Sequence, residues 1–170
     1  DMKKAIYDFA DNLRDAMAIG QGVVLKNTPT PINNVVVAGM GGSAIGGDVN
    51  RMLLRDELPV PIYVSRNYKI PAWADKHTLV IASSYSGGTE ETLSAMTDAL
   101  EKGCHICGIT TGGKLKDVLQ ENDCDTVIIP TGLQPRAALA YSFAPMLYLL
   151  KGFGLVASDI DQKLNKTADL

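Results

Sequence analysis

Short hydrophobic runs alternate with amphipathic stretches along most of this chain. Five of the runs have the length and composition of buried strands: residues 34–38, 61–64, 79–82, 104–109 and 126–129. Between the runs, hydrophobic residues recur every three or four positions, as at Leu93, Met96 and Leu100, and this spacing predicts helices with one buried face. Because strands that alternate with helices form parallel sheets with right-handed crossovers, the pattern predicts an α/β fold.

The predicted architecture is a three-layer αβα sandwich with a five-stranded parallel sheet in the order 2-1-3-4-5. In such sheets, ligands bind outside the carboxyl ends of the strands, at the point where the strand order reverses. Glycine- and serine-rich segments directly follow the first and third strands, at residues 39–48 and 83–89. Since this order makes the two strands neighbours, we expect the two segments to lie side by side at the ligand-binding edge.

Both ends of the chain are predicted to be helical. Residues 2–19 carry apolar side chains at helical spacing, so we expect an amphipathic helix that breaks near Asp11 and ends at Gly20. Residues 155–170 are predicted to begin a helix that leads to a second domain outside this chain, because no capping signal follows. We therefore divide the chain into a helical segment at 1–33, a domain at 34–154 and this final helix.

Composition and charge limit the classes of binding partner that we expect for this chain. A chain of 170 residues forms one domain with a proper core, and its net charge of −3 gives no electrostatic reason to expect nucleic acid or an acidic membrane. No hydrophobic run approaches the roughly 18 residues of a membrane span. The odd number of cysteines, 3, favours a reducing, cytoplasmic location.

A hydroxyl-rich loop at residues 83–89 connects the third strand to a helix. The N–H groups and the positive dipole end of that helix point at whatever occupies the loop, and Ser84, Ser86 and Thr89 add hydroxyl donors. Because the loop has no lysine, it favours a phosphate monoester on a small molecule over a nucleoside triphosphate with its metal. Glu90 and Glu91 follow, and we interpret them as a complement to the helix dipole rather than as a catalytic base.

A glycine-rich loop at residues 39–44 matches the dinucleotide fingerprint G-x-G-x-x-A, so an NADP-dependent oxidoreductase is one alternative. The carboxylate expected at the end of the second strand is missing, however, and Arg66 stands there instead, which would at best fit a 2′-phosphate. We favour the interpretation that Gly41, Gly42 and Ser43 let the backbone close on a sugar.

Two further motifs are weak. Residues 108–115 have the spacing of a Walker A motif, but Leu115 stands where a magnesium-binding Ser or Thr is needed. Cys104 and Cys107 invite a zinc interpretation, yet in a strand they point to opposite faces, and the sequence has no second pair. We therefore expect neither a metal nor a redox cofactor.

Arg136 is the candidate catalytic residue. It lies in a loop after the fifth strand, at the ligand-binding edge and at the start of an apolar helix. A cation gains nothing from the dipole at a helix start, so its position favours an anionic ligand, with a structural ion pair as the alternative.

Together, these motifs resemble the sugar isomerase (SIS) domain family, and most of all the N-terminal half of the bifunctional phosphoglucose/phosphomannose isomerases of bacteria and archaea. The matching segments occur in family order over nearly the whole chain: residues 39–48, 66–71, 84–92, 111–113 and 134–138. Gly88 departs from the family, which usually has Asn at this position.

The resemblance implies a flavodoxin-like SIS domain at residues 34–154 that binds a sugar 6-phosphate. In this family's arrangement Ser84, Ser86 and Thr89 would hold the phosphate, Gly42 would lie near the sugar together with Ser43, and no cofactor would be needed.

The resemblance also implies a reaction. Family enzymes interconvert an aldose 6-phosphate and fructose 6-phosphate through a cis-enediol, and Arg136 would act at the reacting carbons. Their glutamate base and ring-opening histidine come from a second domain or a partner subunit, so we expect a homodimer in the complete protein and poor turnover by this chain alone. A sugar-phosphate-binding regulatory domain without catalysis is the alternative from another functional class.

Overall fold

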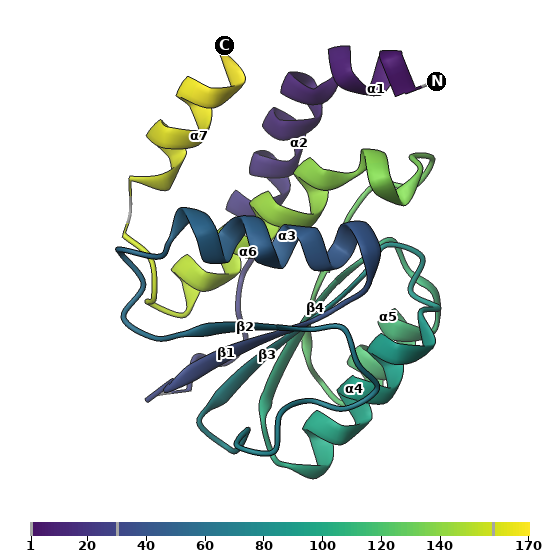
Figure 1. Ribbon diagram of the computed structural model, residues 1–170, viewed down its shortest axis with the longest axis vertical. Helices are drawn as coiled ribbons and strands as arrows, with labels where there is room; N and C mark the ends of the chain where they lie inside the picture. Colours follow the sequence, from purple (N-terminus) through teal and green to yellow (C-terminus); the bar gives the residue numbers. More distant parts are fainter. Residues whose placement is uncertain (1, 30, 158) are drawn as a thin grey trace.

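The computed structural model describes residues 2–29, 31–157 and 159–170, and Figure 1 shows how its elements are arranged. Five parallel strands form a sheet in the order β2-β1-β3-β4-β5: β1 (Asn34–Ala38), β2 (Ile62–Ser65), β3 (Thr78–Ser84), β4 (His105–Thr110) and β5 (Asp125–Ile128). The helices are α1 (Met2–Tyr7), α2 (Phe9–Gln21), α3 (Gly41–Leu53), α4 (Glu90–Glu101), α5 (Gly113–Glu121), the 3₁₀-helix η1 (Pro135–Ala137), α6 (Leu139–Gly152) and α7 (Ile160–Ala168). The predicted fold class and strand order are confirmed.

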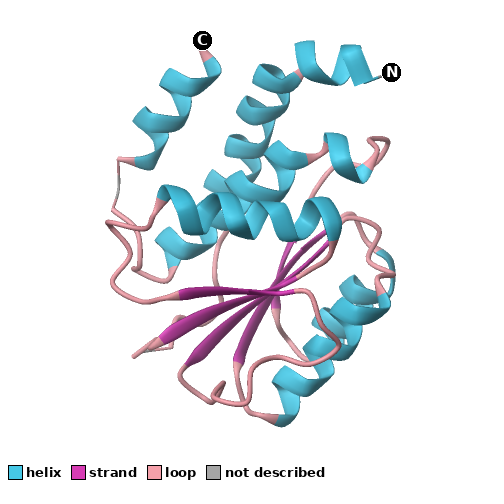
Figure 2. Cartoon of the chain, viewed as in Figure 1, coloured by secondary structure: helices cyan, strands magenta, loops and turns pink. Residues whose placement is uncertain are grey.

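Helices cover both faces of the sheet, with α2, α3 and α6 on one side and α4 and α5 on the other (Figures 1 and 2). Successive strand residues point alternately into the two cores, as the period of a strand requires. Val35 therefore packs in the core beneath α6, and Val36 in the core beneath α4. Cys107 and Cys104 follow the same rule and contact opposite cores, so the two thiols do not share a site.

The register of the sheet brings three loops to one edge. Ala38 at the end of β1 pairs with Ala82 of β3, and Ser84 at the end of β3 pairs with Thr110 at the end of β4. Because the strands are parallel, their carboxyl ends open on the same side. The loops after β1, β3 and β4 therefore emerge next to one another.

The N-terminal helix breaks earlier than predicted. α1 ends at Tyr7 and α2 begins at Phe9, so the interruption lies at Asp8 rather than near Asp11, and α2 continues past Gly20 to Gln21. The apolar spacing identifies the buried face of the helix, on which Leu13 is fully buried. It does not identify where the helix axis bends, because apolar residues continue across the break.

Close packing between α2 and α6 depends on the absence of a side chain at Gly20. A Cβ atom there would lie 2.2 Å from Cδ2 of Tyr148. We expect Gly20→Ala to lower the free energy of unfolding by about 1 to 3 kcal/mol through overpacking. At Gly22, two residues later, a Cβ atom would approach no atom closer than 3.5 Å, so Gly22→Ala should stay within about 0.5 kcal/mol of the wild type. Chemical denaturation of both variants tests this difference, and equal stability would contradict the close contact.

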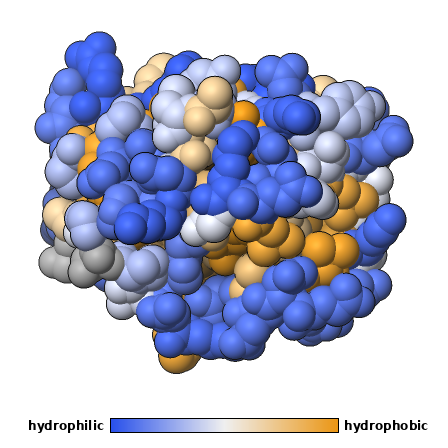
Figure 3. Space-filling view, turned by 90° about the horizontal axis from the view of Figure 1, so that it is seen from below, coloured by the Kyte–Doolittle hydropathy of each residue, from blue (hydrophilic) through white to orange (hydrophobic). Residues whose placement is uncertain are grey.

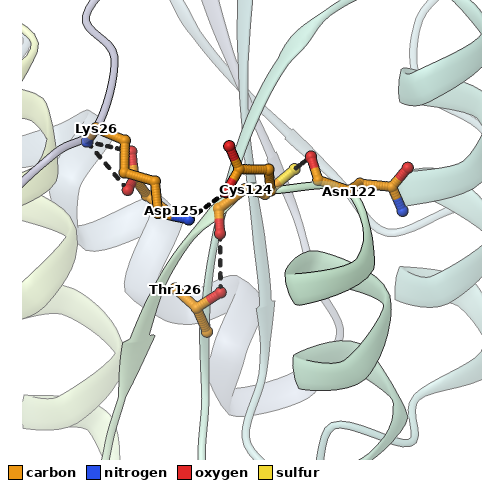
Figure 4. Close-up of polar contacts among 6 residues, drawn as sticks. Lys26, Asn122, Cys124, Asp125 and Thr126 are labelled. Atoms are coloured by element: carbon orange, nitrogen blue, oxygen red, sulfur yellow. Dashed lines mark hydrogen bonds and ion pairs between the residues drawn. The ribbon is translucent and has the colours of Figure 1, made fainter.

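The segment that links α2 to β1 is fixed to the far end of the sheet, as Figure 4 shows. The buried carboxylate of Asp125 accepts the backbone N–H of Lys26 through both oxygens, each at 3.2 Å. The Lys26 ammonium also pairs with Asp123. These contacts hold the linker against β5, at the opposite end of the strands from the ligand-binding edge.

The surface of the described chain is largely hydrophilic with local apolar areas. Figure 3 shows one such area, bordered by hydrophilic residues, on the face seen from below in Figure 1.

Apolar side chains are also exposed on α3, where Ile45, Met52 and Leu53 are 47%, 73% and 55% exposed. Among the residues that the structure describes, no helix combines the length and the apolar character needed to cross a membrane.

Candidate functional site

The hydroxyl loop after β3 is held in shape by Ser84. Its side chain is only 2% exposed, and its Oγ accepts the N–H of Gly87 at 3.1 Å. The same Oγ lies 2.7 Å from the hydroxyl oxygen of Thr89. Ser84, one of the predicted phosphate ligands, therefore makes its hydrogen bonds within the loop and shapes it.

Ser86 and Thr89 are more accessible. Ser86 is exposed, and its Oγ accepts the N–H of Gly88 at 3.2 Å, which leaves the hydroxyl proton available to a ligand. Thr89 precedes the first residue of α4 with extended backbone angles, and no side-chain hydrogen bond caps this helix. The first N–H groups of a helix have no partner within the helix, so the loop and the start of α4 together present donors to an anion.

A second loop, after β4, packs directly against the hydroxyl loop. The backbone of Gly87 has a φ of +71°, and a Cβ atom on it would lie 1.8 Å from the carbonyl oxygen of Gly112. The carbonyl of Gly87 in turn accepts the N–H of Leu115 at 2.8 Å. At Gly113, a Cβ atom would lie 2.6 Å from the carbonyl oxygen of Ser86. The two loops are therefore in backbone contact, and Gly87 and Gly113 make this contact possible.

The glycine-rich segment after β1, predicted as a loop at residues 39–44, is mostly helical, because α3 already begins at Gly41. Gly41 is exposed and has a φ of +52°, whereas Ser43 is only 8% exposed. At Gly42, a Cβ atom would lie 2.7 Å from the carbonyl oxygen of Pro135. The first loop is therefore in backbone contact with the segment that carries Arg136.

Arg136 lies on η1 with its side chain exposed. It borders a polar pocket of about 390 Å³ that α1 closes on one side through Met2 and Ala5. Throughout residues 2–29, 31–157 and 159–170, no carboxylate forms an ion pair with this guanidinium. The alternative of a structural ion pair thus has no partner in the described chain, and the charge is available to a ligand.

Comparison with known proteins gives the family. No protein-family profile matches the chain. The bifunctional phosphoglucose/phosphomannose isomerase of Caldicellulosiruptor bescii is 46% identical over 166 residues, which are 98% of this chain and 49% of that protein. This chain belongs to the sugar isomerase domain family. The enzyme of the same name from Thermoplasma acidophilum is 44% identical over 115 residues, or 68% of this chain and 35% of that protein.

The relatives differ in length and in name. This SIS chain spans about half the length, or less, of the curated relatives it matches. One relative at 39% identity over 113 residues, 66% of this chain and 35% of that protein, is the D-glucosamine-6-phosphate 4-epimerase of Sulfolobus acidocaldarius.

Solved structures share the fold at low sequence identity. The C-terminal domain of glucosamine-fructose-6-phosphate aminotransferase from Francisella tularensis has a TM-score of 0.71 at 16% identity, covering 99% of this chain and 52% of that one. The NanR protein of Vibrio vulnificus, solved with ManNAc-6P, has a TM-score of 0.61 at 19% identity, covering 99% of this chain and 70% of that one. At these identities the likeness shows the fold alone.

Arg66, considered above for a 2′-phosphate, is bound by a carboxylate of this SIS domain. Its guanidinium pairs with Asp48 on α3, which also lies 3.5 Å from Arg51. A 2′-phosphate would have to displace Asp48 from Arg66, so the geometry gives no support to a dinucleotide. Among the described residues, no three His, Cys, Asp or Glu side chains are grouped so as to hold a metal ion.

Tyr85, inside the hydroxyl loop, is a residue that motif analysis did not single out. Its hydroxyl donates to the carbonyl of Pro130 at 3.0 Å and accepts the N–H of Leu133 at 3.0 Å. Its carbonyl accepts both the N–H and the hydroxyl of Thr111, at 3.1 and 2.7 Å. The sequence signals were its place in the family-matching segment 84–92 and its position between two candidate phosphate-binding serines.

Proposed function

We propose that this chain is the sugar-phosphate-binding, N-terminal half of an aldose-ketose isomerase that interconverts glucose 6-phosphate or mannose 6-phosphate with fructose 6-phosphate. One observation carries the proposal: the segment that carries Arg136 contacts the glycine-rich segment at Gly42 and the hydroxyl loop at Tyr85. The names of the curated relatives support it.

The reaction accounts for the residues at this edge. It moves a proton between C1 and C2 through a planar cis-enediol, in which glucose and mannose lose their difference at C2, so one site can serve both sugars. Ser86, Thr89 and the first N–H groups of α4 would hold the 6-phosphate. Arg136 would stabilise the negative charge that develops on the enediolate oxygens, because a cation already in position stabilises a developing charge without further reorganisation.

The base and the ring-opening acid are proposed to come from outside this chain. Glu90 and Glu91 adjoin the loop, but they lie at the start of α4, where carboxylates stabilise the helix dipole. They also face Tyr68, whose pKa their negative charges raise. We therefore expect the 170-residue chain to bind sugar phosphates and to turn them over poorly.

Assembly and location belong to the same proposal. We propose a cytoplasmic homodimer for the complete protein, acting without metal, redox cofactor, nucleic acid or membrane. The exposed apolar side chains of α3 support an interface on this helix. A monodisperse monomer of the complete protein would contradict the dimer.

The direct test removes the accessible hydroxyls together. We expect Ser86→Ala combined with Thr89→Ala to weaken binding of fructose 6-phosphate to this chain at least about tenfold, because hydrogen bonds to a charged phosphate are each worth about 1.5 to 3 kcal/mol. Isothermal titration calorimetry measures the affinity. The ligands should also include glucosamine 6-phosphate, in view of the epimerase relative, and NADP, which we expect not to bind.

A matched double variant on the same helix controls for general effects. Ser94→Ala combined with Thr97→Ala removes one serine and one threonine hydroxyl from α4 beyond the loop, and it should leave the affinity within about twofold of the wild type. Equal affinity in the loop variant and the wild type would place the phosphate site elsewhere. If the complete protein binds the sugar phosphate without turnover, the regulatory alternative replaces the isomerase.

A further inference from the structure

We propose that Tyr85 is a positioning residue, which fixes the segment carrying Arg136 relative to the hydroxyl loop. This inference rests on the proposed function, and it assigns a role to a side chain that need not touch the substrate. Its basis is that the single residue Tyr85 makes hydrogen bonds to the loops after β4 and β5 while it belongs to the loop after β3.

The side chain of Tyr85 binds the loop after β5 at two positions. Its hydroxyl is an acceptor for the Leu133 N–H and a donor to the Pro130 carbonyl, both at 3.0 Å. These two groups lie three residues apart on the segment that leads into η1. The half-buried ring packs against the same core as Leu133, so both the ring and the hydroxyl hold this segment.

The backbone of Tyr85 is fixed independently of its side chain. Its carbonyl receives two hydrogen bonds from Thr111, and the next turn of the loop is braced where Gly87 meets Gly112. The tyrosine hydroxyl therefore projects from a rigid loop. In contrast, the loop after β5 is held by fewer contacts. Within the described chain, its hydrogen bonds to side chains all involve Tyr85, and Pro135 also contacts Gly42.

Tyr85 would keep constant the distance between the two elements that bind the two ends of a sugar phosphate. A sugar 6-phosphate has its phosphate at one end and its reacting carbons at the other, so the hydroxyl loop and Arg136 must keep a constant separation. Tyr85 links these two elements directly. Loss of the Tyr85 hydroxyl should leave the hydroxyl loop at residues 83–89 intact and allow Arg136 to move.

The experiment is a double-mutant cycle on the 170-residue chain, with two probes measured by calorimetry. Inorganic phosphate reports on the loop alone, and 5-phosphoarabinonate adds a carboxylate where the enediolate would lie. We expect Tyr85→Phe and Arg136→Ala each to weaken 5-phosphoarabinonate about tenfold, and the double variant no further, because residues that act as one unit are not additive. All variants should bind inorganic phosphate within about twofold of the wild type, which also verifies folding.

Tyr148→Phe is the matched control, since it removes the hydroxyl of a buried tyrosine that pairs with Asp161, away from the loops after β3 and β5. It should change neither affinity. An unchanged 5-phosphoarabinonate affinity in Tyr85→Phe, an additive double variant, or an equal loss for inorganic phosphate would each overturn the positioning role alone. A wild-type chain that binds neither probe would overturn the proposed function, and the role of Tyr85 with it.

Discussion

Gly87→Ala should weaken binding of fructose 6-phosphate to this chain by about 30- to 1,000-fold. The new Cβ atom would lie 1.8 Å from the carbonyl oxygen of Gly112, and the backbone φ of +71° is strained for alanine. The left-handed conformation costs roughly 1 to 2 kcal/mol, and displacement of the packed backbone adds about 1 to 3 kcal/mol. If most of this cost falls on the binding-competent loop, an energy of about 2 to 4 kcal/mol corresponds to that range of affinity.

The neighbouring glycine provides the control for this prediction. A Cβ atom at Gly88 would approach only the Oγ of Ser86, at 3.9 Å, which is ordinary contact. Gly88→Ala should therefore bind fructose 6-phosphate within about threefold of the wild type. Calorimetry gives the affinities, and thermal unfolding separates a local loop defect from global destabilisation. Similar affinities in the two variants would mean that the loop in solution does not press against the loop after β4.

The fold could be predicted well because its signals are local. The run at residues 34–38 is bounded by Asn33 and by a glycine-rich loop, and β1 has the predicted bounds. The other four strands differ from their predicted bounds by one or two residues: β2 and β4 lie one residue later, β5 lies one residue earlier, and β3 extends by one residue at its start and two at its end. Backbone pairing sets these bounds, and the apolar runs mark them only approximately. The break at Asp8 could not be located for the same reason: an unbroken apolar pattern crosses it.

The candidate site could be predicted only in part. Hydroxyls and glycines at the carboxyl ends of strands are visible in the sequence, and the sheet order places their loops side by side. The contacts of Tyr85 with Pro130 and Leu133, however, span 45 and 48 positions along the chain. They depend on the course of an irregular loop, for which hydrophobic periodicity gives no information.

Burial also divided the predicted phosphate ligands into two kinds. Ser84 and Ser86 differ by two positions, and the sequence gives them the same chemistry. In the structure Ser84 is buried and bonded to Gly87 and Thr89, whereas Ser86 is exposed. The roles of these hydroxyls toward a phosphate remain predictions, but the difference explains why we choose Ser86 and Thr89 for substitution rather than Ser84.

In a complete isomerase containing this chain, Arg136→Lys should lower kcat by about 100-fold or more while KM changes by less than about threefold. Lysine keeps the positive charge but loses the planar set of donors that can face two enediolate oxygens together. Removal of one preorganised donor to a developing oxyanion typically costs about 2.7 to 4 kcal/mol in the transition state and little in the ground state. Steady-state kinetics with glucose 6-phosphate and mannose 6-phosphate measure the two constants.

Arg55→Lys is the corresponding control, because Arg55 is exposed, pairs only with its neighbour Asp56 among the described residues, and lies beyond the far end of α3. It should match the wild type in both constants. A rise in KM with unchanged kcat in Arg136→Lys would show that the guanidinium binds the substrate without acting on the enediolate. Since this segment touches the glycine-rich segment at Gly42 and the hydroxyl loop at Tyr85, Arg136 would then serve to hold the sugar between the two.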